Sequence, residues 1–76
     1  MRKRHVFNTK LDQWLEAHKV KPARLAYESG YSRQHLLRIR KGEMEPTRRC
    51  IAAIVTAARK LSGEAVRASE LFDLGD

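Results

Sequence analysis

Four polar residues between positions 33 and 38 carry side chains that can hydrogen-bond to the edges of DNA bases. Arg33 and Arg38 each end in a guanidinium fork, which can donate two parallel hydrogen bonds to O6 and N7 of guanine. Gln34 ends in an amide, which can pair with N6 and N7 of adenine. His35 is a lesser candidate for the same role. These residue types in this order indicate a segment that reads base edges.

The residues around this segment predict the helix that would present it. Ser32 is a strong helix N-cap, and Gly42 is the residue type that most often ends a helix in the left-handed conformation. Leu36 and Ile39 form the buried side of such a helix, because residues three apart share a face. We therefore expect a short helix over residues 32–41 with its basic face turned outwards, as the major groove of DNA requires.

Other basic residues are candidates for phosphate contacts. Arg48 and Arg49 fall in the first turn of a predicted helix, where cations oppose the helix dipole and an anion would be stabilised. Lys21 and Lys41 are further candidates. The same role, along a DNA groove, is open to the three basic residues of the N-terminal arm, Arg2, Lys3 and Arg4. The alternatives are exposed charges on a solvated face for the helical arginines and a disordered, solubilising tail for the arm.

The charge balance of the chain favours a polyanionic partner. Sixteen Lys and Arg oppose nine Asp and Glu in 76 residues, a net charge of +7. The charge is uneven, since residues 61–76 hold one basic and four acidic residues and so are not expected to face that partner. The lone Cys50 excludes an intramolecular disulfide, and no apolar run is long enough for a membrane span. We expect a cytoplasmic protein.

The remaining apolar spacing predicts an all-α domain over residues 7–76, after a flexible arm at 1–6. The first helix has Leu11, Trp14, Leu15 and His18 on one face and Asn8 or Thr9 as its cap. The second helix begins at Pro22 and ends at Ser29 and Gly30. The fourth is capped by Thr47, buries Ile51, Ile54, Val55, Ala58 and Leu61, and ends at Ser62 and Gly63. The fifth runs from Ser69 to Leu74, and no segment alternates as a strand would.

The segment KPARLAYESGYSRQHLLRIRKGEMEPT, residues 21–47, resembles the helix-turn-helix of the Cro/C1-type (Xre-like) repressor family. The matching positions are Leu25, Ala26, Gly30, Ser32, Ile39, Gly42 and Pro46, and Glu70, Leu71 and Phe72 resemble the family's last helix. The resemblance implies a compact five-helix, lambda-repressor-like fold with the helix-turn-helix at helices two and three. It also implies base contacts by Arg33, Gln34 and Arg38, phosphate contacts near Arg48 and Arg49, and a homodimer on a pseudo-palindromic operator.

Several positions depart from the family's pattern or stay open. Pro22 stands where the family often has a DNA-contacting Gln, and Arg40 where it has an acid. Arg40 could meet Asp12 or Glu16 on the first helix, or serve DNA. Leu37 could touch a thymine methyl, the second helix, or nothing. Trp14 and Phe72 are expected in the core, Tyr31 is undecided, and Cys50 is expected to be semi-buried near the start of the fourth helix.

The leading hypothesis is a transcriptional regulator that represses by occupying its operator. The alternative is an antitoxin-like or phage accessory module whose acidic C-terminal segment, Glu64 to Asp76, binds another protein, with DNA binding secondary. A third hypothesis is non-specific architectural binding to nucleic acid, which requires only the net positive charge. We expect no enzyme activity, no cofactor and no metal site, because the histidines and Cys50 lack ligand spacing and no nucleophile is paired with a base.

Overall fold

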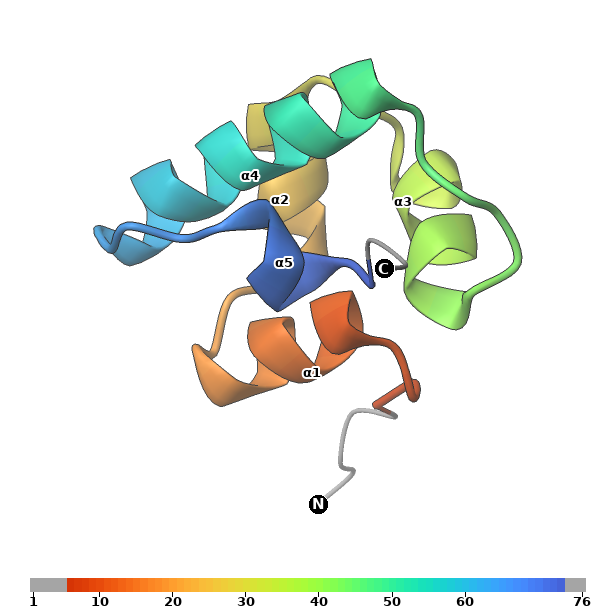
Figure 1. Cartoon of the computed structure of the whole chain (residues 1–76), viewed down its shortest axis with the longest axis horizontal. Helices are drawn as coiled ribbons and strands as arrows, with labels where there is room; N and C mark the ends of the chain where they lie inside the picture. The colour runs from red at the N-terminus through yellow and green to blue at the C-terminus, as the bar shows by residue number, and fades with distance from the viewer. Residues whose placement is uncertain (1–5, 74–76) are drawn as a thin grey trace.

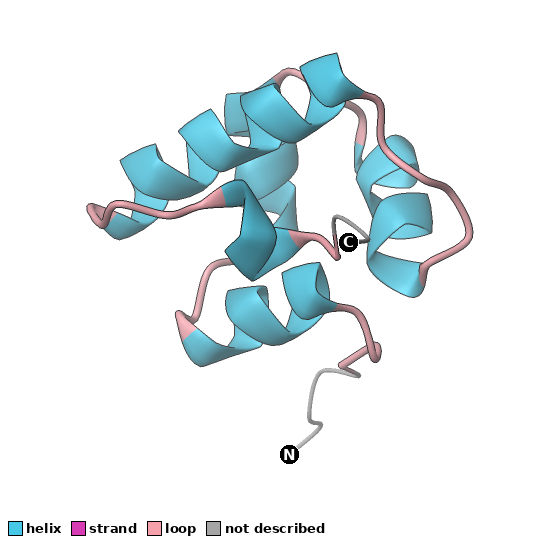
Figure 2. Cartoon of the chain, viewed as in Figure 1, coloured by secondary structure: helices cyan, strands magenta, loops and turns pink. Residues whose placement is uncertain are grey.

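Five α-helices make up the described part of the computed structural model, residues 6–73. They are α1 (Lys10–Ala17), α2 (Pro22–Ser29), α3 (Arg33–Lys41), α4 (Arg48–Ser62) and α5 (Ala68–Leu71), with no strand in the described range (Figure 2). The all-α prediction is confirmed at this level. The last helix is shorter than expected and ends at Leu71 rather than Leu74. Leu74 and the arm residues Arg2, Lys3 and Arg4 lie outside the described residues.

Three helices begin at a hydroxyl side chain that caps them. Thr9, Ser32 and Thr47 each accept a hydrogen bond from the backbone N–H three residues further on. Such a cap satisfies one of the N–H groups that the first turn leaves without a helical partner, and it is worth about 1 kcal/mol. The predicted caps are thereby confirmed, with Thr9 rather than Asn8 starting α1.

The connection between α2 and α3 depends on Gly30. Its φ of +83° is left-handed, and its N–H bonds back to the carbonyls of Ala26 and Tyr27. A residue with a Cβ would be strained in this conformation, whereas glycine adopts it freely. The chain can therefore leave α2 and start α3 after only three residues, Gly30 to Ser32.

The core lies where α4, α2, α1 and α5 meet. α4 packs mainly on α2, while α5 lies between α4 and α1, and α3 is held at one end of the domain by α2 and α1 (Figure 1). The most deeply buried large side chains of the core include Leu11, Leu25, Leu36 and Ile54. The radius of gyration is 11.4 Å, close to the value of about 11 Å expected for a folded chain of this length. The domain is therefore compact.

Several core positions can be compared with the sequence-based predictions. Trp14 and Phe72 are buried, as expected, and Cys50 is more deeply buried than expected, with 2% exposure. Val66, in the loop before α5, is 1% exposed and was not predicted to be buried. Its carbonyl accepts a hydrogen bond from Nε of Arg59 at 2.8 Å, which ties the loop to α4.

Across residues 6–73, no helix combines the length and the apolar character needed to cross a membrane.

Candidate nucleic-acid interface

The outer face of α3 gathers the basic and amide side chains. At about 100° per residue, five positions fall within an arc of about 140°. They are Arg33, Gln34, Leu37, Arg38 and Lys41, of which Leu37 is half-buried and the other four are exposed. The opposite face carries Leu36 and Ile39, which are 1% and 4% exposed. The three main candidates for base reading, Arg33, Gln34 and Arg38, therefore share one exposed surface.

The His35 ring lies away from that surface. It stacks on Tyr31 with 4.9 Å between ring centroids, and its Nε2 lies 3.9 Å from Sγ of Cys50 on α4. The half-buried imidazole is thus engaged between α3 and α4. The structure places His35 apart from the other three candidates for base reading.

Cys50 and Tyr31 complete this small cluster behind α3. Burial raises the pKa of the Cys50 thiol, and a hydrogen bond with the Tyr31 side chain opposes that shift. The pKa of Tyr31 is raised too, first by desolvation and then by Cys50. Both groups therefore stay protonated at neutral pH, and the half-buried Tyr31 packs against α3 through its stacking on His35.

A buried ion pair fixes the far end of α3 on α1. Nε of Arg40 donates to Oδ1 of Asp12 at 2.6 Å, and the Asp12 side chain is completely buried. The other carboxylate oxygen accepts the backbone N–H of Phe7 at 2.7 Å. The guanidinium carbon of Arg40 also lies 5.4 Å from the centre of the Phe7 ring. Of the roles open to Arg40, the structure supports the contact with Asp12.

Thr9 adds a second tie between the same two helices. Its hydroxyl donates to the carbonyl of Arg40 at 2.6 Å while accepting from the N–H of Asp12 at 3.2 Å. One side chain thus caps the start of α1 and satisfies a carbonyl in the last turn of α3, where helical partners run out. Nothing in the sequence indicated this contact, because Thr9 and Arg40 are 31 residues apart.

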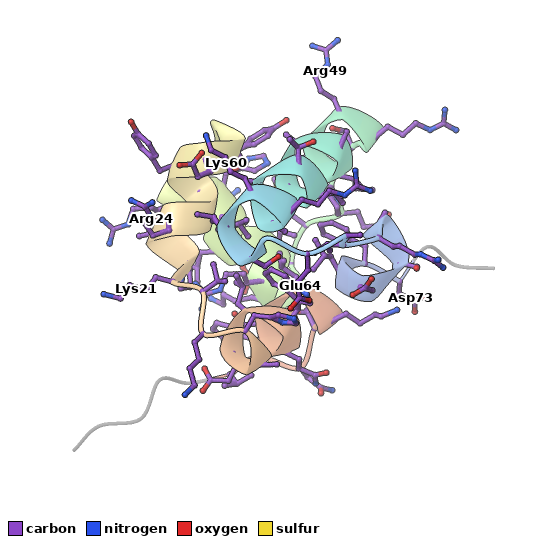
Figure 3. The ribbon with its side chains drawn as sticks, turned by 90° about the vertical axis from the view of Figure 1, so that its left-hand side faces the viewer. Lys21, Arg24, Arg49, Lys60, Glu64 and Asp73 are labelled. Carbon is purple, nitrogen blue, oxygen red and sulfur yellow. The ribbon has the colours of Figure 1, made fainter. Side chains whose placement is uncertain are left out.

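A shallow hollow separates the start of α2 from the first half of α3. Lys21, Pro22 and Ala23 line it on the α2 side, and Arg33, Gln34 and Leu37 line it on the α3 side. Lys21 and its neighbour Arg24 project away from the body of the domain (Figure 3). The structure therefore brings Lys21, a candidate for phosphate contact, to the same surface as Arg33 and Gln34.

The start of α4 carries Arg48 and Arg49, both exposed. Arg49 extends beyond the end of the domain (Figure 3). The first turn of α4 contains no acidic residue, so its positive helix end is not compensated within the turn. Lys41 differs from these two arginines because its Nζ lies 3.2 Å from a carboxylate oxygen of Glu43, in a pair that is itself exposed.

Acidic residues of the C-terminal segment contact the domain itself. Oε1 of Glu64 lies 3.5 Å from Nε2 of His18, and Oε2 of Glu70 accepts the N–H of Arg67 at the start of α5. Glu70 therefore contributes to a helix cap, and a change at this position would disturb α5 as well as any partner contact.

Neither a metal site nor a similar protein adds information about the function. Within the described range, no group of three or more His, Cys, Asp or Glu side chains is placed to hold a metal ion. Searches of family models, curated proteins and solved structures gave no match to this chain.

Proposed function

We propose that this protein is a sequence-specific, double-stranded DNA-binding regulator of transcription whose α3 lies in the major groove. The observation that carries the proposal is the outer face of α3, where Arg33, Gln34 and Arg38 are exposed together while Leu36 and Ile39 are buried. The major groove is about 12 Å wide, so it admits an α-helix, and the groups on this face match guanine and adenine edges.

The arrangement of α2 and α3 supports the same proposal. Two short helices joined through Gly30, with Ser32 capping the second, are compatible with the proposed helix-turn-helix. In that motif the first helix crosses the DNA backbone while the second enters the major groove. Lys21 at the start of α2 and the pair Arg48 and Arg49 at the start of α4 would then contact phosphates. Such contacts fix the register of the protein on the duplex without reading sequence.

The regulator is proposed to act as a repressor, by occupying a promoter as a homodimer. The resemblance of residues 21–47 to the Cro/C1-type family supports this mode of action. A dimer places two copies of α3 in successive major grooves, about 34–36 Å apart, and its operator is expected to be a pseudo-palindrome. The arm residues Arg2, Lys3 and Arg4 belong to this proposal as further phosphate contacts.

The test is selection of bound duplexes from a random-sequence pool at near-physiological salt, followed by affinity measurements on the selected site. Arg38→Ala is expected to cost about 1–3 kcal/mol on that site and to relax the choice at one base pair. The matched control is Lys60→Ala, which also removes one positive charge, from the last turn of α4, where Lys60 pairs with Glu28 of α2 at 3.0 Å. This variant should leave the selected base pairs unchanged. A pool without an enriched motif contradicts the proposal.

A further inference from the structure

An apolar side chain stands in the middle of the basic face of α3. Leu37 is one turn beyond Arg33, and on the helix surface it falls between Arg33 on one side and Gln34 and Arg38 on the other. It is half-buried, so part of its side chain is open to a partner. A single exposed leucine needs no explanation by itself, and the surroundings of Leu37 decide its meaning.

The hollow beside Leu37 is lined by both apolar and polar side chains. Pro22 and Ala23, at the start of α2, line it together with Leu37, and none of these three side chains can donate or accept a hydrogen bond. Exposed Lys21, Arg33 and Gln34 belong to the same lining.

Arg40 also lines the hollow, but its guanidinium is directed at Asp12. Its side chain is 12% exposed and donates from Nε to the buried carboxylate. The charge of Arg40 is therefore balanced by Asp12 beside the hollow.

Only one base presents an apolar group in the major groove, namely thymine with its 5-methyl group. The cations Lys21 and Arg33 in the lining suit the phosphates nearby, and the apolar side chains of the lining suit a group that forms no hydrogen bonds. We infer that Leu37, together with Pro22 and Ala23, recognises the methyl group of one thymine in each half-site. This inference rests on the proposed function and adds a base identity that the hydrogen-bonding side chains do not supply.

The experiment replaces thymine by uracil, which removes only the methyl group. Each thymine of the selected duplex is exchanged in turn for deoxyuridine, and affinities are measured for the wild type, Leu37→Ala and Leu37→Met. Loss of one buried methyl group corresponds to about fourfold weaker binding. We expect this loss at one thymine per half-site for the wild type and Leu37→Met, and no loss at that position for Leu37→Ala.

The outcomes separate the inference from the function on which it rests. Thermal melting and binding to random duplexes verify that Leu37→Ala is folded, and the wild-type comparison of thymine with uracil needs no variant at all. A selected motif with no methyl-sensitive thymine overturns the inference and leaves the proposed function intact. Methyl sensitivity that persists in Leu37→Ala overturns the assignment to Leu37. A pool with no motif overturns the proposed function, and the inference with it.

Discussion

Removing Arg40 should be among the most destabilising single changes in this domain. Arg40→Met keeps an apolar stem beside Phe7 but removes the guanidinium that donates to the carboxylate of Asp12, a side chain that is 0% exposed. Breaking a buried ion pair from one side costs about 3–5 kcal/mol. A domain of 76 residues has a total stability of only about 4–11 kcal/mol. The variant should therefore lose about a quarter or more of its stability and melt at least about 12 °C lower.

A second substitution at Asp12 provides the decisive comparison. Asp12→Asn keeps an oxygen that can accept the N–H of Phe7, but it removes the buried charge. It should therefore destabilise the wild type, where Arg40 would lose its counter-ion, and stabilise the Arg40→Met variant, where the guanidinium of Arg40 no longer balances the buried carboxylate. Denaturant unfolding followed by circular dichroism gives the free energies of the four proteins, and their difference gives the coupling energy.

The exposed pair of Lys41 and Glu43 is the matched control, since it also joins a cation and a carboxylate near the end of α3, at 3.2 Å. Lys41→Met should change the stability by no more than about 1 kcal/mol. If Arg40→Met lowers the free energy of unfolding no more than Lys41→Met does, the buried pair does not contribute the expected stability. The same conclusion follows if Asp12→Asn changes the free energy of unfolding equally with and without Arg40.

Three further predictions concern other parts of the domain. Arg48→Ala should weaken binding to the selected site and to random DNA by similar factors, and should lower the slope of log affinity against log salt by about one. A loss of preference at a single base pair, without general weakening, would contradict a phosphate contact. The raised pKa of Cys50 means that the unfolded thiol, with a pKa near 8.5, ionises before the folded one. The free energy of unfolding should therefore be level below about pH 8 and fall towards pH 10. The fall should be less steep in Cys50→Ala, and parallel curves for the two proteins would exclude the Cys50 thiol as its cause. Lys19 has a φ of +56°, a left-handed conformation that glycine adopts without strain. Lys19→Gly should therefore raise the free energy of unfolding by up to about 1 kcal/mol in the same assay. A lower free energy of unfolding would show that contacts of the Lys19 side chain stabilise the fold by more than the backbone strain costs.

Features set by neighbouring residues could be predicted from the sequence. Ser32 and Thr47 cap their helices as expected, and Gly30 and Gly42 end theirs in the left-handed conformation. These outcomes depend on hydrogen bonds and backbone preferences within one turn of a helix, so a local pattern contains the needed information. The all-α organisation followed from the same local signals.

Features set by packing between distant residues could not be predicted in full. The sequence offered Asp12 and Glu16 as equal partners for Arg40, and only the rotation of α1 against α3 selects Asp12. His35 directly follows the polar residues Arg33 and Gln34 in sequence, yet its ring turns towards Cys50, fifteen positions away. Val66 lies in a loop, where the sequence has no apolar periodicity, so no local pattern indicates that its side chain is buried.

The two ties between α1 and α3 also constrain how this sequence can change over time. Asp12 and Arg40 form a buried pair in which neither partner is tolerated without the other. A chain that exchanges one of them first must pass through an intermediate of low stability, so the two positions should vary together among descendants of this sequence. The outer face of α3 carries no such restriction, since Arg33, Gln34 and Arg38 are exposed. Under the proposed function, descendants can therefore acquire new base preferences by single substitutions on that face while positions 12 and 40 stay fixed.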